Sequence, residues 1–142
     1  MAKKLRIKTG NGVSSKSSLN LKVDSPPDYD SKPPIFSLER LQSGKYCHSA
    51  LDKDHKAAFS DAIFKRKSIS WRELKSSGKH GLGFEKIAKK SISEKLPAFI
   101  TQEADNLLAF RFKGKAPMVG YRVKDVFYVL WFDRDFTLYN HG

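Results

Sequence analysis

Short hydrophobic runs separated by turn residues fill the last third of the chain, a pattern typical of consecutive antiparallel strands. In the first run, Leu108, Phe110 and Phe112 occupy every second position, which predicts a strand with one buried face. A second run spans residues 121–123. The third, residues 126–132, is hydrophobic throughout, which predicts a strand that is covered on both faces. The pattern therefore places a sheet at the centre of the protein.

A further strand is predicted at the end of the chain, over residues 136–141. Hydrophobic and polar residues alternate there. Phe136 and Leu138 would face the core, while Tyr139 and His141 would share the opposite face.

Arginines lie in two of the predicted strands, Arg111 in the first and Arg122 in the second. Together with Tyr139 and His141 they form the most suggestive group of polar side chains in the sequence. A structural role is the alternative for these residues. Arg122 can pair with a nearby aspartate, Tyr139 can be a half-buried strand residue, and His141 can belong to a mobile C-terminus.

Two helices are predicted before the sheet. Residues 52–65 place hydrophobic side chains at helical spacing, with Asp52 as the N-cap. In the second helix Ser70 and Glu73 form a capping box, Gly78 is placed to end the helix, and the tryptophan at its start should pack against the sheet. We therefore expect an α+β fold, with an antiparallel sheet of three to five strands packed by two N-terminal helices.

The chain divides into a tail and one domain. Residues 1–34 read as a flexible basic tail, because serine and lysine are frequent and large hydrophobic residues are few. Two Pro-Pro pairs near its end cannot continue into a helix or a central strand. Residues 35–142 are expected to form a single α+β domain, beginning with a possible strand at Ile35.

The segment after the second helix contains Gly81 and Gly83, spaced as Gly-x-Gly. No predicted strand precedes them and no third glycine follows, so a phosphate-cradling loop is a poor fit. We expect these glycines to let the chain turn. Lys79 and His80 can still lie over a bound nucleic-acid strand. The following residues 84–96 show no regular period.

The charge of the chain points to a polyanionic partner. Its 142 residues carry 27 Lys and Arg against 15 Asp and Glu, a net charge of +12. Clustered cations attract phosphate over a Debye length of about 8 Å at physiological salt. A basic surface that serves only solubility is the alternative interpretation.

Cys47 is the single cysteine of the chain, which excludes an intramolecular disulfide and leaves it and the adjacent His48 with too few partners for a zinc site. No hydrophobic stretch approaches the roughly 20 residues of a membrane span, and no secretory signal is apparent. We therefore expect a cytoplasmic protein with no membrane contact and no metal.

Three short motifs accompany this order of helices and strands. They are an arginine between phenylalanines in one strand, a Tyr-Arg-Val strand, and a closing tyrosine and histidine, within residues 109–112, 120–123 and 139–141. With two helices before the sheet, this combination resembles the RelE/ParE-like toxin superfamily of toxin–antitoxin systems. The resemblance covers about residues 52–141.

The resemblance implies a metal-independent endoribonuclease that cleaves mRNA, either free or bound to the ribosome. The ribose 2′-hydroxyl attacks the adjacent phosphate, leaving a cyclic phosphate and a 5′-hydroxyl. Arg111 and Arg122 would stabilise the phosphate charge. Tyr139 and His141 would supply acid and base. The nucleic-acid-binding residues would be Lys79, His80, Lys113 and Lys115.

Such a toxin would have RNA as substrate and a cognate antitoxin protein covering the basic face of its sheet, and it would need no cofactor. Two alternatives share the fold. One is a noncatalytic nucleic-acid-binding module. The other is a protein-interaction module, for which a phage origin is one option. Inhibition of a topoisomerase, the activity of another branch of the superfamily, is a further alternative.

Overall fold

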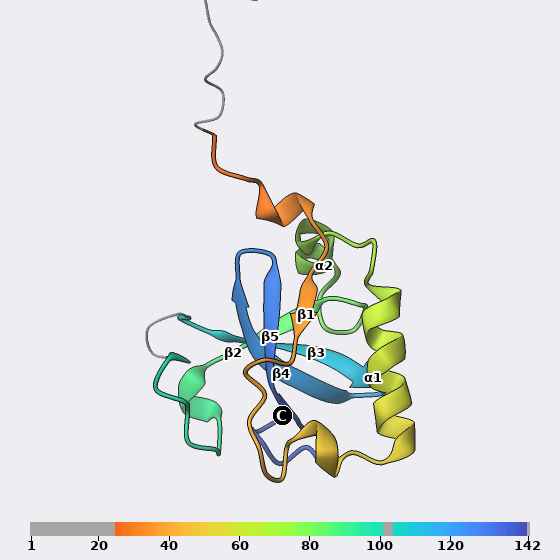
Figure 1. Cartoon of the computed structure of the whole chain (residues 1–142), viewed down its shortest axis with the longest axis vertical. Helices are drawn as coiled ribbons and strands as arrows, with labels where there is room; N and C mark the ends of the chain where they lie inside the picture. Colours follow the sequence, from red (N-terminus) through yellow and green to blue (C-terminus); the bar gives the residue numbers. More distant parts are fainter. Residues whose placement is uncertain (1–24, 101–103, 142) are drawn as a thin grey trace, which may run out of the picture.

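The computed structural model describes residues 25–100 and 104–141 and shows an α+β fold built on one sheet (Figure 1). The sheet has the strand order β1-β5-β4-β3-β2. The strands are β1 (Ile35–Ser37), β2 (Phe84–Ile87), β3 (Leu107–Lys113), β4 (Ala116–Val123) and β5 (Val126–Phe132). The α+β class predicted from the sequence is confirmed. Most of the predicted tail lies outside the described residues.

One edge of the sheet differs from the prediction. Strands β2 to β5 pair antiparallel in sequence order, but β1 runs parallel to β5, with Ile35 opposite Val126 and Ser37 opposite Tyr128. The wholly antiparallel sheet predicted from the sequence is therefore wrong at β1. The spacing of hydrophobic residues reports which face of a strand is buried, whereas it contains no information on the direction of the neighbouring strand.

The hairpin of β3 and β4 gathers basic residues at one end of the sheet. Its turn contains Gly114, whose φ of 57° lies in the left-handed region that glycine adopts without strain. The pairing register shifts between Arg111 and Lys113, which marks a β-bulge. Lys115 follows Gly114 in the turn. Arg111, Lys113 and Lys115 therefore lie close together at this end of the sheet.

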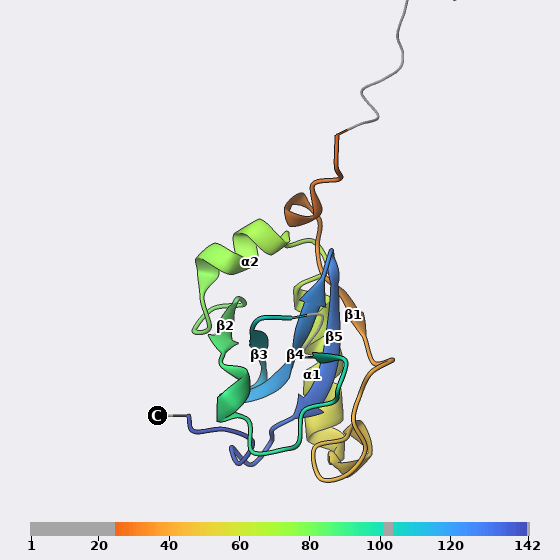
Figure 2. The ribbon, with the colours of Figure 1, turned by 90° about the vertical axis from the view of Figure 1, so that its left-hand side faces the viewer.

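Two α-helices pack against the sheet, α1 (Lys53–Lys65) and α2 (Trp71–Ser77), and Figure 2 shows α2 above β2. Both begin as predicted. The Asp52 side chain accepts a hydrogen bond from the backbone N–H of His55, and Ser70 and Glu73 form the capping box. Among the described residues there are also three short 3-10 helices, η4 (Tyr29–Ser31), η5 (His48–Ala50) and η6 (Lys89–Ser91). No helix in the described part of the chain is long and apolar enough to cross a membrane.

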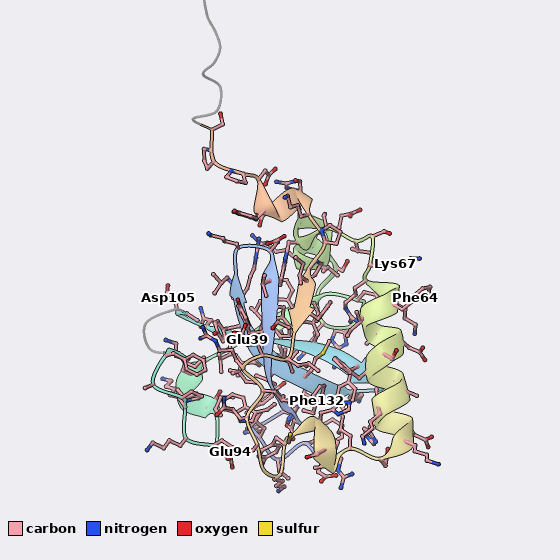
Figure 3. All side chains as sticks on the ribbon, viewed as in Figure 1. Glu39, Phe64, Lys67, Glu94, Asp105 and Phe132 are labelled. Carbon is pink, nitrogen blue, oxygen red and sulfur yellow. The ribbon has the colours of Figure 1, made fainter. Side chains whose placement is uncertain are left out.

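The helices cover one face of the sheet with hydrophobic side chains. Phe59 of α1 packs against Phe132 of β5, with ring centroids 4.9 Å apart, and Trp71 of α2 is fully buried against Phe110. Phe64, on the outer side of α1, is 65% exposed and points away from the sheet (Figure 3). The sheet-facing side of each helix thus supplies the core of this layer.

The second face of the sheet is covered by the segments that precede α1, that join β2 to β3, and that follow β5. These segments contribute Tyr46, Ile100 and Leu138 to a core that includes Tyr121 and Leu130 of the sheet. Strand β5 therefore has buried residues on both faces, as its uninterrupted hydrophobic run predicts.

The strand predicted at the C-terminus is not formed. Residues 133–141, here called the C-terminal segment, have no regular secondary structure, and Phe136 has a φ of 61° and is 45% exposed. Both carboxylate oxygens of Asp133 accept backbone N–H groups, those of Thr137 and Leu138. An aspartate that captures backbone donors in this way favours a turn over a strand. Leu138 is fully buried, as predicted, whereas the prediction that Phe136 faces the core is wrong.

The glycine-containing loop between α2 and β2 folds back onto the end of α2. Gly78 has a φ of 71°, and a Cβ at Gly83 would overlap the carbonyl oxygen of Leu74 and lie 2.7 Å from the backbone N of Gly78. At Gly81 a Cβ would make only ordinary contacts. The prediction that a glycine lets the chain turn here is confirmed at Gly83, and this turn places Lys79 and His80 beside β3.

Gly83→Ala should destabilise the protein more than Gly81→Ala. Overpacking against backbone atoms typically costs about 1–3 kcal/mol, so we expect a loss of that size in the free energy of unfolding for Gly83→Ala. For Gly81→Ala, where the nearest atom would be 3.5 Å away, we expect a change within about 0.5 kcal/mol. Denaturant unfolding of both variants measures the difference, and equal losses would contradict the close approach at Gly83.

Candidate functional site

Six of the eight residues predicted for the functional site line one pocket. The pocket has a volume of about 250 Å³ and lies between β3 and the C-terminal segment; it is called the C-terminal pocket below. In Figure 2 the C-terminal segment runs from the lower end of β5 toward the side of β2. The six predicted residues in its lining are Lys79, His80, Arg111, Lys115, Tyr139 and His141.

Arg111 is the arginine that lines this pocket. The pairing of β2 with β3 ends at Phe110, so β2 does not cover the edge of β3 beyond that residue. Strand alternation puts Arg111 on the same face as Ala109, toward the C-terminal segment. Its backbone oxygen accepts a hydrogen bond from Nη2 of Arg66 at 3.2 Å, and its own Nη1 lies 3.4 Å from Nδ1 of His80. The bond from Arg66 fixes the backbone at Arg111, and His80 contacts the guanidinium itself.

Asp133 fastens the C-terminal segment and orients His141. The carboxylate is fully buried and accepts the backbone N–H groups of Thr137 at 2.8 Å and Leu138 at 3.1 Å. Its Oδ2 also lies 2.8 Å from Nε2 of His141, whose side chain is 24% exposed. When Nε2 carries the proton of the neutral ring, Nδ1 is left as the basic atom. This pair has the geometry of a general base oriented by a carboxylate.

Tyr139 stacks on His141, with ring centroids 4.0 Å apart and planes inclined by 26°. The residue is only 8% exposed. Burial raises the pKa of the Tyr139 phenol, and the negative charges of Glu85 and Asp133 raise it further. The positive charge of Arg111 acts in the opposite direction. The phenol is therefore protonated at neutral pH and is a hydrogen-bond donor rather than a base.

Three residues of the site were missed by the sequence analysis. Glu85 of β2 lines the pocket and pairs with Nζ of Lys79 at 3.4 Å, and Phe136 packs edge-on against the His141 ring at 5.2 Å. The role of Asp133 could have been predicted from the sequence, because an aspartate directly after a hydrophobic strand commonly accepts hydrogen bonds from backbone N–H groups in a turn. Glu85 gave no signal, since its segment has no regular period.

Two predicted residues are not part of the C-terminal pocket. Lys113 lines a neighbouring pocket between α1 and the end of β3. Arg122 lies at the other end of β4, where Nη2 donates to Oδ1 of Asp30 at 2.7 Å and the guanidinium sits 4.3 Å from the centre of the Trp71 ring. The structure thus gives Arg122 a structural role, fastening part of the predicted tail to the domain.

The C-terminal pocket combines an imidazole with a supporting carboxylate, a protonated phenol and several cations. Lys79, Arg111 and Lys115 face one acidic lining residue, Glu85, so the pocket has a net positive charge. This set can bind a phosphate ester and move protons at its oxygens. No group of three or more His, Cys, Asp or Glu side chains suited to a metal ion occurs within residues 25–100 and 104–141.

Asp133→Asn should loosen the C-terminal segment. An asparagine offers one acceptor oxygen in place of two, which leaves a buried N–H or the His141 ring without its acceptor, at a cost of about 1–3 kcal/mol. Asp135→Asn is the matched control, because the Asp135 side chain is 58% exposed and only pairs with the adjacent Arg134. We expect denaturant unfolding to show that loss for Asp133→Asn alone. Similar stability of the two variants would refute the anchoring role.

Tyr139 should titrate after an ordinary tyrosine. Its raised pKa means that the phenolate absorbance missing from Tyr139→Phe, relative to the wild type, should appear above the usual value of 10.0. The folded state holds this proton more tightly than the unfolded chain, so its contribution to stability is present below pH 10.0 and is lost as the pH rises beyond it. An alkaline absorbance titration centred at the ordinary value would show that the phenol is not buried as described.

Comparison with known proteins adds no relative from which a role can be transferred. The chain matches no protein-family model, no curated protein and no solved structure. What the chain does must therefore be inferred from the residues of the C-terminal pocket and their geometry.

Proposed function

We propose that this chain is a metal-independent endoribonuclease that acts as the toxin of a toxin–antitoxin system, with the C-terminal pocket as its active site. The observation that carries the proposal is the position of His141. A buried carboxylate orients its ring, and the ring lines the same basic pocket as Arg111. A phosphodiester is the substrate that matches a cationic pocket equipped for proton transfer.

Each step of RNA cleavage has a candidate residue in the pocket. His141 Nδ1 takes the proton of the ribose 2′-hydroxyl as the bond from O2′ to phosphorus forms. The guanidinium of Arg111, with Lys115, stabilises the charge that develops on the phosphate oxygens. Tyr139 donates its proton to the departing 5′-oxygen as the bond from phosphorus to O5′ breaks.

Proton transfer restores the starting state. After cleavage His141 is an imidazolium and Tyr139 a phenolate, stacked 4.0 Å apart. Because burial raises the pKa of Tyr139, its phenolate readily regains a proton from the imidazolium, directly or through water. The products are a cyclic phosphate and a 5′-hydroxyl, and no metal ion takes part.

The partners follow from the same proposal. The substrate is mRNA, either free or on the ribosome, and a cognate antitoxin would neutralise the chain by covering the basic pocket. The α+β fold, with both helices on one face of the sheet, is compatible with the RelE-like architecture, and the cationic pocket on the opposite face supports this assignment.

A noncatalytic RNA-binding module is the second candidate, and the burial of Tyr139 favours it. A phenol that is 8% exposed with a raised pKa is a weak proton donor to a bound ligand. The cationic side chains would then bind RNA without cleaving it. Cleavage assays separate the two functions directly.

Purified protein should cleave single-stranded RNA in the presence of EDTA and leave 5′-hydroxyl ends. His141→Ala and Arg111→Ala should each lower the cleavage rate by about 100-fold or more, because they remove the base and the phosphate cation. Arg72→Ala is the matched control, since Arg72 is an exposed arginine paired with Asp28, outside the pocket, and should leave the rate unchanged.

The same assay shows how the proposal fails. Cleavage that persists in His141→Ala and Arg111→Ala would place the active site elsewhere. Wild-type protein that binds RNA but leaves it intact would identify the binding module. Arrest of bacterial growth on expression, relieved by either substitution at equal protein level, is expected of the toxin.

A further inference from the structure

A second pocket adjoins the C-terminal pocket on the other side of β3. It has a volume of about 360 Å³ and lies between α1, the loop after α2 and the end of the β3–β4 hairpin; it is called the α1 pocket below. Lys65 of α1 and Lys113 of β3 line it, together with Asp61. Its volume falls within the range of roughly 300–1,000 Å³ that is usual for ligand sites.

The two pockets join at the uncovered edge of β3. Both are lined by His80 and Arg111, which lie 3.4 Å apart. Because β2 leaves β3 uncovered beyond Phe110, no strand separates the two pockets at this point. Phe112 faces the helices, whereas Ala109 faces the C-terminal segment, so the combined groove passes from one face of the sheet to the other.

Arg66 adds a buried positive charge beside the groove. It lines the α1 pocket and is 2% exposed, and its guanidinium donates to the backbone oxygens of Leu82 at 2.8 Å, Ala62 at 2.9 Å and Arg111 at 3.2 Å. These bonds tie the loop, α1 and β3 together. Because Arg66 is buried, its charge is poorly solvated and its pKa is lowered to about 10, and an anion in the groove would stabilise that charge.

The cations of the groove outnumber its acids. Asp61 and Glu85 are the acidic lining residues, and Glu85 is already paired with Lys79. The lysines at the outer positions, Lys65 and Lys113, are exposed. A chain of phosphates is the ligand that matches cations spaced along a groove.

We propose that the α1 pocket binds the RNA backbone next to the cleaved phosphate, so that the substrate is a single-stranded RNA that bends around the edge of β3. This inference rests on the proposed function, because it takes the C-terminal pocket as the place of cleavage. A duplex cannot follow a path that turns from one face of a sheet to the other, whereas an unpaired strand can.

The test compares a dinucleotide with a hexanucleotide of RNA in wild-type protein and in Lys65→Ala/Lys113→Ala. The wild type should bind the hexanucleotide about 10-fold or more tightly than the dinucleotide, and the double variant should lose that gain. The dependence of log K on log salt should fall by about 1.4, since each contact to a single strand contributes ~0.7.

Lys56→Ala/Lys90→Ala is the matched control, because both lysines are exposed and neither lines the groove. It should bind both RNAs as the wild type does. If the double variant does not fold, Lys65→Ala alone, at an exposed helix position, should lower the salt dependence by about 0.7.

Non-cleavable RNAs with 2′-O-methyl groups separate this inference from the proposed function. A length-dependent affinity that is lost only in Lys65→Ala/Lys113→Ala would support the groove even if the chain cleaves nothing. Cleavage without any gain from length, or equal behaviour of the double variant and its control, would overturn the groove and leave the proposed function intact. Tighter binding of a duplex of the same sequence would also overturn it.

Discussion

The buried carboxylate of Asp133 accepts backbone N–H groups of the C-terminal segment, and these hydrogen bonds fix the position of that segment. Without an acceptor inside the protein, the N–H groups of Thr137 and Leu138 would have to pair in a ladder or with water. Asp133 satisfies both and contacts Nε2 of His141 with the same oxygen that accepts from Leu138. Because Leu138 is fully buried, the segment is also held by hydrophobic packing. The Asp133 side chain therefore has two roles: it stabilises the turn after β5, and it orients His141, the candidate base.

The opposite wall of the site depends on a second buried charge. Arg66 follows α1 directly and reaches three backbone carbonyls, which belong to the helix, the glycine loop and β3. A buried guanidinium is costly unless its donors are satisfied, so these contacts fix the distance between the elements that carry His80 and Arg111. The close approach at Gly83 works in the same direction, because it brings the loop against the end of α2. The backbone segments that carry the cations of the groove are therefore held together by packing and hydrogen bonds.

The sequence predicted best where local signals act alone. Caps at Asp52 and Ser70 located both helices, and the hydrophobic runs located β3 and β5. Prediction from the sequence failed where contacts between distant parts of the chain override the local spacing of hydrophobic residues. The alternation over residues 136–141 is that of a strand, yet Asp133 captures the backbone and forms a turn. Arg122 resembled a phosphate ligand, but its partner Asp30 lies 92 residues away in a segment predicted to be a tail. Such pairings leave no trace in the spacing of residues along the chain.

The central claim is that an RNA phosphate binds between Arg111 and His141, and one measurement tests it most directly. In an NMR titration of the full chain with a dinucleoside phosphate that carries a 2′-O-methyl group, binding can be followed without cleavage. The account predicts saturable shifts of the Arg111 guanidinium and the His141 ring at one common dissociation constant, with Arg122 unchanged. Shifts confined to the Arg122 end of the sheet, or no saturable shift at Arg111 and His141, would contradict it.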